Sequence, residues 1–216
     1  YWFSLAGAYT ELGEDQNLIA AYDAAFTQGM FDKESEYVTM AQLFMQAEVP
    51  NKAAQVMQEQ MEAGVVEVIA KNYRLLSQAL TLAAEDEASL PALQQAARLS
   101  DDGELNVRLG NAHLNLGQYE ECAAAVRDGL RKGGLKSPDN AQISLGMCLY
   151  NLREYDDSIA AFREAGKAQR SQRISRQWIN VIESDLERIR QIRLAETAAR
   201  KQLEELAERR RSAERI

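Results

Sequence analysis

The sequence contains few side chains that could take part directly in catalysis. His113 is the only histidine, and Cys122 and Cys148 are the only cysteines. A histidine serves as a general base when it lies next to a serine or cysteine nucleophile and an acid orients its ring. No such nucleophile and acid accompany His113 in a recognised order, so we predict a structural role for His113, partly buried between helices.

Short acidic clusters are the other groups that could do chemistry, as ligands for a metal ion. They occur at residues 85–87, 101–102 and 120–121. Adjacent side chains on a helix point in different directions, and the spacing does not follow that of a calcium loop. Nor does the sequence contain a zinc pattern, a phosphate-binding glycine loop or a nucleotide fingerprint. We therefore predict solvated turns at these clusters, no metal, no cofactor and no enzymatic activity.

The two cysteines are too few for a disulfide scaffold. Each lies among apolar residues at helical spacing, and free cysteine is among the residues most often buried. We predict that Cys122 and Cys148 are small core residues. The alternative that they pair in an oxidising compartment stays open.

The composition indicates an all-α protein. Of 216 residues only three are proline and twelve glycine, whereas good helix formers such as Ala, Leu, Glu, Gln and Arg are abundant. No run of 18 uncharged apolar residues occurs, so we predict no membrane span. The sequence begins at Tyr1 inside an apparent helix and without an initiating Met, so we expect further residues upstream in the full-length protein.

Charge is distributed unevenly along the chain. Residues 1–165 contain 12 Lys and Arg against 25 Asp and Glu, and residues 166–216 contain 13 against 8. A nucleic-acid partner requires a basic face for its phosphates, which the acidic body lacks. We therefore exclude a nucleic-acid partner, while the basic end of the chain remains able to contact acidic groups.

A repeated pattern organises the first 165 residues. The first copy has Trp2, Leu5, Ala6, Tyr9, a turn at Gly13, and then Tyr22 and Ala25. The same frame returns at offsets of 35, 36, 33 and 36 residues, when it is aligned on Ala6, Ala41, Ser77, Gly110 and Gly146. These small residues lie in the middle of the first helix of each copy, where they allow a second helix to approach closely. Small residues on the second helix complete the contact: Ala53, Ser89, Cys122 and Ser158.

Each copy therefore predicts a helical hairpin. Gly13, Pro50 and Gly117 are expected to end a first helix and let the chain reverse. A single hairpin cannot bury its apolar face alone, so we predict a right-handed α-solenoid of about five hairpins, at residues 1–33, 34–69, 70–102, 103–138 and 139–170. The first helices are expected to line its concave face.

The residues after the repeats predict two further segments. Ile174, Trp178, Val181, Ile182 and Leu186 indicate a capping helix over residues 171–190 that covers the last repeat. Residues 191–216 are highly charged and include Arg209, Arg210 and Arg211. For this charged helical tail we keep three structures open: a long exposed helix, a short coiled coil and a frayed end. Binding of the tail to an acidic lipid surface is a weaker option.

The spacing W-x2-L-[GA]-x2-Y of the first copy and its recurrence over residues 1–165 resemble the tetratricopeptide superfamily. More narrowly, residues 2–29, residues 37–57, residues 100–116 and the RQWINVI segment resemble periplasmic tetratricopeptide proteins associated with TonB systems of Gram-negative bacteria. This resemblance implies a periplasmic accessory of energy-dependent uptake across the outer membrane that works by contacting other envelope proteins. The charged tail lies outside the matched part.

The predicted ligand is a protein or peptide in the groove of the first helices. The Lys, Asn and Arg clamp with which some cochaperone members of the superfamily grip a C-terminal carboxylate is absent, because its positions carry Phe3, Gly7, Val38, Thr39, Gln42 and Leu75. The groove candidates are Phe3, Val38, Gln42, Arg74, Gln78, Arg108, Asn111 and Met147. We predict a non-catalytic interaction scaffold. A generic cytoplasmic adaptor and an accessory region of a larger protein remain as alternatives, and the oligomeric state stays open.

Overall fold

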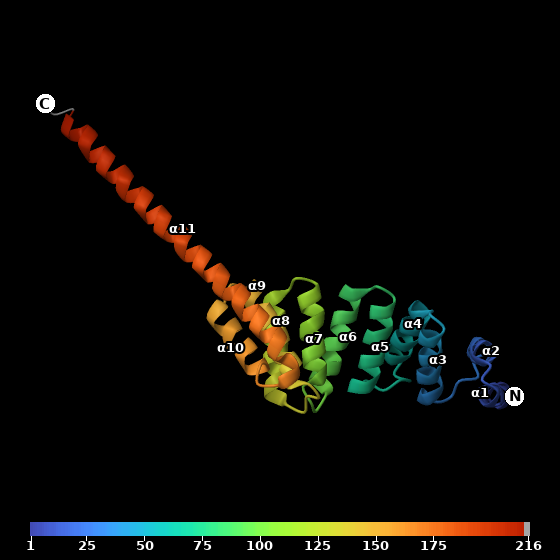
Figure 1. Cartoon of the computed structure of the whole chain (residues 1–216). Coiled ribbons are helices and arrows are strands. Elements are labelled where there is room, and N and C mark those ends of the chain that lie inside the picture. Colours follow the sequence, from blue (N-terminus) through green and yellow to red (C-terminus); the bar gives the residue numbers. More distant parts are fainter. Residues whose placement is uncertain (214–216) are drawn as a thin grey trace. The chain divides into compact units, whose positions relative to one another are not determined.

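The computed structural model describes the backbone of residues 1–213 and the side chains of residues 1–207; the last three residues lie outside the described part. Within it the chain is helical, without strands (Figure 1). The helices are α1 Trp2–Leu12, α2 Asp15–Thr27, α3 Glu34–Gln46, α4 Pro50–Glu62, α5 Ala70–Leu82, α6 Asp86–Leu99, α7 Glu104–Asn115, α8 Tyr119–Lys132, α9 Pro138–Asn151, α10 Tyr155–Ala165 and α11 Gln172–Ala213, with a 3-10 turn at Gln169–Ser171. The all-α prediction is confirmed.

The chain divides into two compact units, Tyr1–Lys136 and Ser137–Ile216. The first unit contains four helical hairpins, α1/α2, α3/α4, α5/α6 and α7/α8, which follow one another in a row (Figure 1). The second contains the fifth hairpin, α9/α10, and α11, which packs against α10. The number of hairpins agrees with the predicted solenoid of about five.

All five hairpins turn by the same backbone motif. One residue at each turn has a positive φ: Gly13, Glu48, Ala84, Gly117 and Arg153. The residue after each of them donates its N–H to a carbonyl five positions back, as in Glu14 N to Tyr9 O at 3.0 Å and Gln118 N to His113 O at 2.9 Å. This is the Schellman end of a helix, in which one left-handed residue satisfies the last carbonyls.

Glycine supplies the left-handed residue at only two of these turns. Glu48, Ala84 and Arg153 adopt φ values of 58°, 60° and 63°, a conformation that costs about 1 kcal/mol or more for a residue with a Cβ. The prediction that Pro50 ends a first helix is wrong. Pro50 begins α4, where its missing N–H has no helical partner to lose, and Glu48 makes the reversal.

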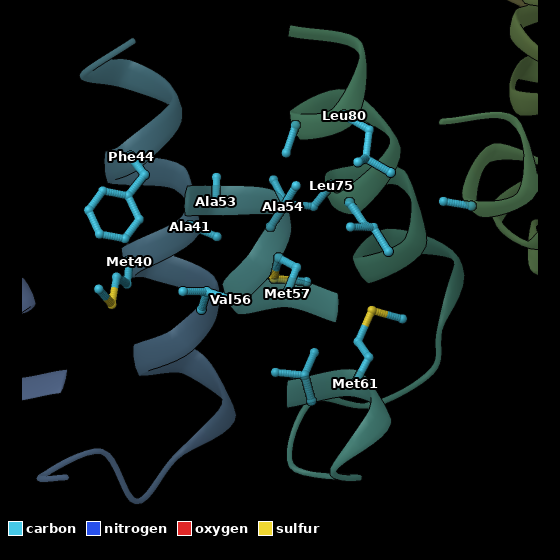
Figure 2. Close-up of a cluster of buried hydrophobic side chains, with 14 of the residues drawn as sticks. Met40, Ala41, Phe44, Ala53, Ala54, Val56, Met57, Met61, Leu75 and Leu80 are labelled. Carbon is cyan, nitrogen blue, oxygen red and sulfur yellow. The ribbon is translucent and has the colours of Figure 1, made fainter. Parts of the chain in front are cut away.

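Small residues lie where the helices of a hairpin approach each other, as predicted. Ala41 on α3 and Ala53 on α4 are completely buried and lie at the crossing in Figure 2, with Met40, Phe44 and Met57 around them. Apolar side chains of α5 join the same core, so the second and third hairpins share it. This sharing is the reason that stacked hairpins are stable when a single hairpin is not.

Two glycines in the middle of first helices allow close approaches of this kind. A Cβ built on Gly110 would lie 2.3 Å from Cγ2 of Val126 on α8, and one built on Gly146 would lie 2.8 Å from the ring of Phe162 on α10. In the second case Ser158 also donates a hydrogen bond of 2.7 Å to the Gly146 carbonyl. A side chain at either position would therefore force the two helices apart.

The first part of α11 covers the fifth hairpin, as the predicted capping helix should. The ring of Trp178 stacks on Phe162 with centroids 5.4 Å apart, and Ile182 is completely buried beside it. The Tyr150 hydroxyl donates a hydrogen bond of 2.7 Å to Asp185. These contacts fix α11 to α9 and α10.

A buried carboxylate fastens the start of α11 to the start of α9. Asp139 accepts hydrogen bonds from Arg170 Nε at 2.7 Å and Ser171 Oγ at 2.6 Å. These hydrogen bonds, with the charge of Arg170, hold the pKa of Asp139 far below its usual value despite burial, which acts in the opposite direction. The carboxylate stays ionised at neutral pH and ties the two segments together.

The rest of α11 extends away from the hairpin as a single helix (Figure 1). Every side chain of residues 191–207 is exposed, including Ile192, Leu194, Leu203 and Leu206. Of the predicted alternatives for the tail, the structure has the long exposed helix. The side chains of Arg209, Arg210 and Arg211 lie outside the described residues. No described helix is both long and apolar enough to cross a membrane.

Candidate functional site

A row of polar side chains marks the outer surface of the first helices of the first unit. Gln42 on α3, Gln78 on α5 and Asn111 on α7 are all exposed. They occupy the equivalent position in three successive repeats, and each has amide donors and acceptors that could pair with a peptide backbone. These three predicted groove residues are therefore accessible to a partner.

Two other predicted groove residues take part in packing within the fold. The Phe3 ring lies 5.9 Å from the Tyr22 ring and 5.7 Å from the Phe31 ring, and it remains 37% exposed. Val38 on α3 is half-buried and packs against the core that contains Phe31. Because Phe3 contacts Tyr22 and Phe31, and Val38 packs against the core, each offers only part of its surface to a ligand.

Arg74 and Arg108 are brought together in one cavity of about 270 Å³. They lie on α5 and α7, the first helices of successive hairpins. Lys71 on α5 and Lys136 in the segment after α8 line the same cavity. We call the cavity formed by these four cations, with its other lining residues, the cationic pocket.

The two acidic residues of the cationic pocket accept hydrogen bonds from nearby backbone N–H groups. Asp102 Oδ1 accepts a hydrogen bond of 3.0 Å from the Glu104 N–H and one of 3.4 Å from the Ser100 hydroxyl. Glu104 Oε2 accepts a hydrogen bond of 3.3 Å from the Lys136 N–H. Among the described side chains, residues 1–207, no ion pair within 4.0 Å is formed by any of the four cations.

Close backbone contacts hold one wall of the cationic pocket in place. The Gly103 N–H donates a hydrogen bond of 2.8 Å to the Gly133 carbonyl, and a Cβ on Gly134 would lie 2.8 Å from Cβ of Asp102. Both Gly133 and Gly134 have positive φ, which favours glycine. The segment that contains Lys136 therefore lies tightly against the turn before α7.

Sequence reasoning found only half of these cations. Lys71 is three residues before Arg74 and so shares its side of the helix, a signal that could have identified it. Lys136 lies outside any helix, and its place follows from the two left-handed glycines and from Glu104. No pattern in the sequence indicated that the segment after α8 returns to the start of α7.

Met147 belongs to the second unit and packs against its core, with Ile159, Phe162 and Ile182. It is half-buried in α9. The eighth groove candidate is therefore in part a core residue, like Phe3 and Val38.

His113 and the two cysteines are partly or completely buried, as predicted, whereas residues 86–87 and 120–121 lie in α6 and α8 and not in the predicted turns. His113 is partly buried, and its Nδ1 lies 2.6 Å from Gln118 Oε1 at the end of α7. Cys122 and Cys148 are completely buried in α8 and α9. The acidic clusters at 85–87, 101–102 and 120–121 are exposed, and no group of three or more potential metal ligands is found among the described residues.

Comparison with known proteins identifies the type of fold. Residues 103–131 match the tetratricopeptide repeat family, and this segment covers most of the α7/α8 hairpin. No curated protein sequence matches the chain significantly. The family match is thus limited to one repeat of the sequence.

Solved structures resemble the chain over most of its length. They include MamA, at 17% identity and a TM-score of 0.64, with 77% of this chain and 88% of that chain covered. YrrB, described as a tetratricopeptide protein with an unusual peptide-binding site, has 16% identity and a TM-score of 0.65, covering 82% and 89%. The C-terminal part of a tetratricopeptide protein from Cytophaga hutchinsonii has 12% identity and a TM-score of 0.67, covering 86% and 71%. The tetratricopeptide-type solenoid fold is confirmed.

Proposed function

We propose that this chain is a non-catalytic scaffold that binds a partner protein on the face of its first helices. The observation that carries the proposal is the row of exposed amides on three successive first helices, Gln42, Gln78 and Asn111. An extended or helical peptide lying across this row would meet one polar side chain from each hairpin. YrrB, which has a similar fold and is described as having an unusual peptide-binding site, supports peptide binding as the role of the chain.

A photo-crosslinking experiment tests which face binds. A photoreactive amino acid would replace Gln42 or Gln78 on the first helices, and Gln58 or Gln94 on the second helices would serve as matched controls, because all four are exposed glutamines. We expect partner proteins from the native host to crosslink through positions 42 and 78. Crosslinking only through positions 58 and 94, or through none of the four, would contradict the proposal.

We further propose that the scaffold is a periplasmic accessory of a TonB-type envelope transport system. Support comes from the sequence resemblance of residues 2–29, 37–57 and 100–116 to periplasmic tetratricopeptide proteins of such systems. The acidic repeat region, residues 1–165, continues into the long exposed helix α11, an arrangement that suits a protein that positions other envelope components.

Fractionation of the native host tests this narrower role. The full-length protein would be located in periplasmic and cytoplasmic fractions and then purified with its crosslinked partners. We expect it in the periplasm, together with envelope proteins of the transport machine. Recovery in the cytoplasm with cytosolic partners only would favour a general adaptor instead, and a much longer full-length protein with a catalytic domain would favour an accessory repeat region.

A further inference from the structure

We propose that the cationic pocket formed by Lys71, Arg74, Arg108 and Lys136 recognises aspartate or glutamate side chains of the partner peptide. The inference rests on the proposed function, because Arg74 and Arg108 lie on the same first helices, and it specifies the chemistry of the ligand. Arg74 and Arg108 are predicted groove residues, while Lys71 and Lys136 are added by the structure.

The charge of the cationic pocket is opposite to that of its surroundings. The first unit, residues 1–136, contains 10 Lys and Arg against 20 Asp and Glu. Four of those ten cations line the cationic pocket, with only Asp102 and Glu104 as acidic neighbours. A protein with a net charge of −10 in this unit repels acidic ligands in general, so local attraction at the pocket selects where such a ligand can bind.

The two acidic neighbours do not neutralise the four cations by ion pairing. Their hydrogen-bonded oxygens, Asp102 Oδ1 and Glu104 Oε2, accept from the backbone N–H groups of Glu104 and Lys136. Four cations and two carboxylates line about 270 Å³, and no ion pair within 4.0 Å joins them among the described side chains. The pocket therefore has an excess of positive charge, and a carboxylate entering it would form charge-assisted hydrogen bonds with the guanidinium groups.

The geometry favours side-chain carboxylates on a peptide that lies along the first helices. Arg74 and Arg108 come from successive repeats and are both exposed, so a chain crossing from α5 to α7 passes both. Arginine pairs with carboxylate through two parallel N–H donors, which gives direction as well as strength. The adjacent amides Gln78 and Asn111 on the same helices are available for the peptide backbone.

Selection from a random peptide library displayed on phage tests the proposal with the intact chain. We expect the wild-type protein to enrich peptides that contain Asp or Glu, against the overall charge of the protein. The Arg74→Gln/Arg108→Gln variant should lose this enrichment. The Lys33→Gln/Arg98→Gln variant is the matched control, because it removes two exposed cations of the same unit that lie outside the cationic pocket.

A selected peptide would then be titrated by fluorescence anisotropy, beside a copy in which Asn and Gln replace Asp and Glu. The acidic peptide should bind the pocket variant at least about tenfold more weakly than wild type, and the control variant within about twofold, because only the former loses direct charged contacts. An equal loss of affinity for the acidic peptide in the pocket and control variants, or equal affinity of the wild type for the two peptides, would overturn the assignment of the cationic pocket as a carboxylate site. Peptides that bind without acidic residues would refute it while leaving the proposed function intact, whereas enrichment of no peptide at all would count against the binding face itself.

Discussion

Replacement of Gly110 by alanine tests the close approach of α7 and α8 directly. The new Cβ would lie 2.3 Å from Val126 Cγ2, 3.1 Å from the Cys122 carbonyl oxygen and 3.3 Å from the Val126 nitrogen. Val126 is completely buried, and a β-branched side chain in a helix has one strongly preferred rotamer. The contact can therefore be relieved only by moving α7 and α8 apart.

The expected magnitude follows from two opposing effects. Alanine favours the helix over glycine by about 1 kcal/mol, whereas overpacking a tight core costs about 1–3 kcal/mol. Gly7 in the interior of α1 is the matched control, because nothing lies within 4 Å of a Cβ built there. The Gly7→Ala variant should gain about 0.5–1 kcal/mol of stability, and the Gly110→Ala variant should be about 1–3 kcal/mol less stable than that control.

Urea denaturation followed by far-ultraviolet circular dichroism measures both variants against wild type. Equal stabilisation by the two substitutions would show that α7 and α8 are not in close contact at Gly110. A double-mutant cycle with Val126→Ala adds a second check, because removing Cγ2 removes the clashing atom. The combined variant should be more stable than the sum of the single effects predicts, and additivity within about 0.5 kcal/mol would contradict the assigned contact.

Four further predictions concern the turns and α11. Ala84→Gly should raise the free energy of unfolding by about 0.5–1 kcal/mol in urea denaturation, since it relieves a φ of 60°; a loss of stability would contradict the left-handed turn. Ile182→Ala should cost about 2–5 kcal/mol, whereas Ile192→Ala, which is 51% exposed, should change stability by less than about 0.5 kcal/mol. The folded-state pKa of Asp139 is lowered, so the ionised carboxylate stabilises the fold at neutral pH, and this stabilisation is lost as the pH falls below about 4. The difference in melting temperature between wild type and Asp139→Asn should therefore shrink below that pH. A difference independent of pH would argue against the ionised contact. Truncation after Arg190 should reduce helicity only by the residues removed, and a larger loss by circular dichroism would show that the tail supports the hairpins.

The number of hairpins and their helices could be predicted from the sequence alone. The repeat places a small residue at the centre of each first helix, and Ala41, Ala53, Gly110 and Gly146 are buried where the helices cross. This succeeded because close helix packing requires a particular size of side chain, and size is visible in the sequence. Trp178 and Ile182 likewise indicated the capping helix through their spacing.

The turns and the cationic pocket were decided by the tertiary structure. Glu48, Ala84 and Arg153 occupy left-handed turns although no local preference favours them there, because the packing of both flanking helices fixes the reversal. Lys136 joins Arg74 and Arg108 through contacts of Gly103, Gly133 and Glu104, which are separated along the chain. A local pattern records which residues suit a helix; which cations meet in one pocket depends on how successive hairpins stack.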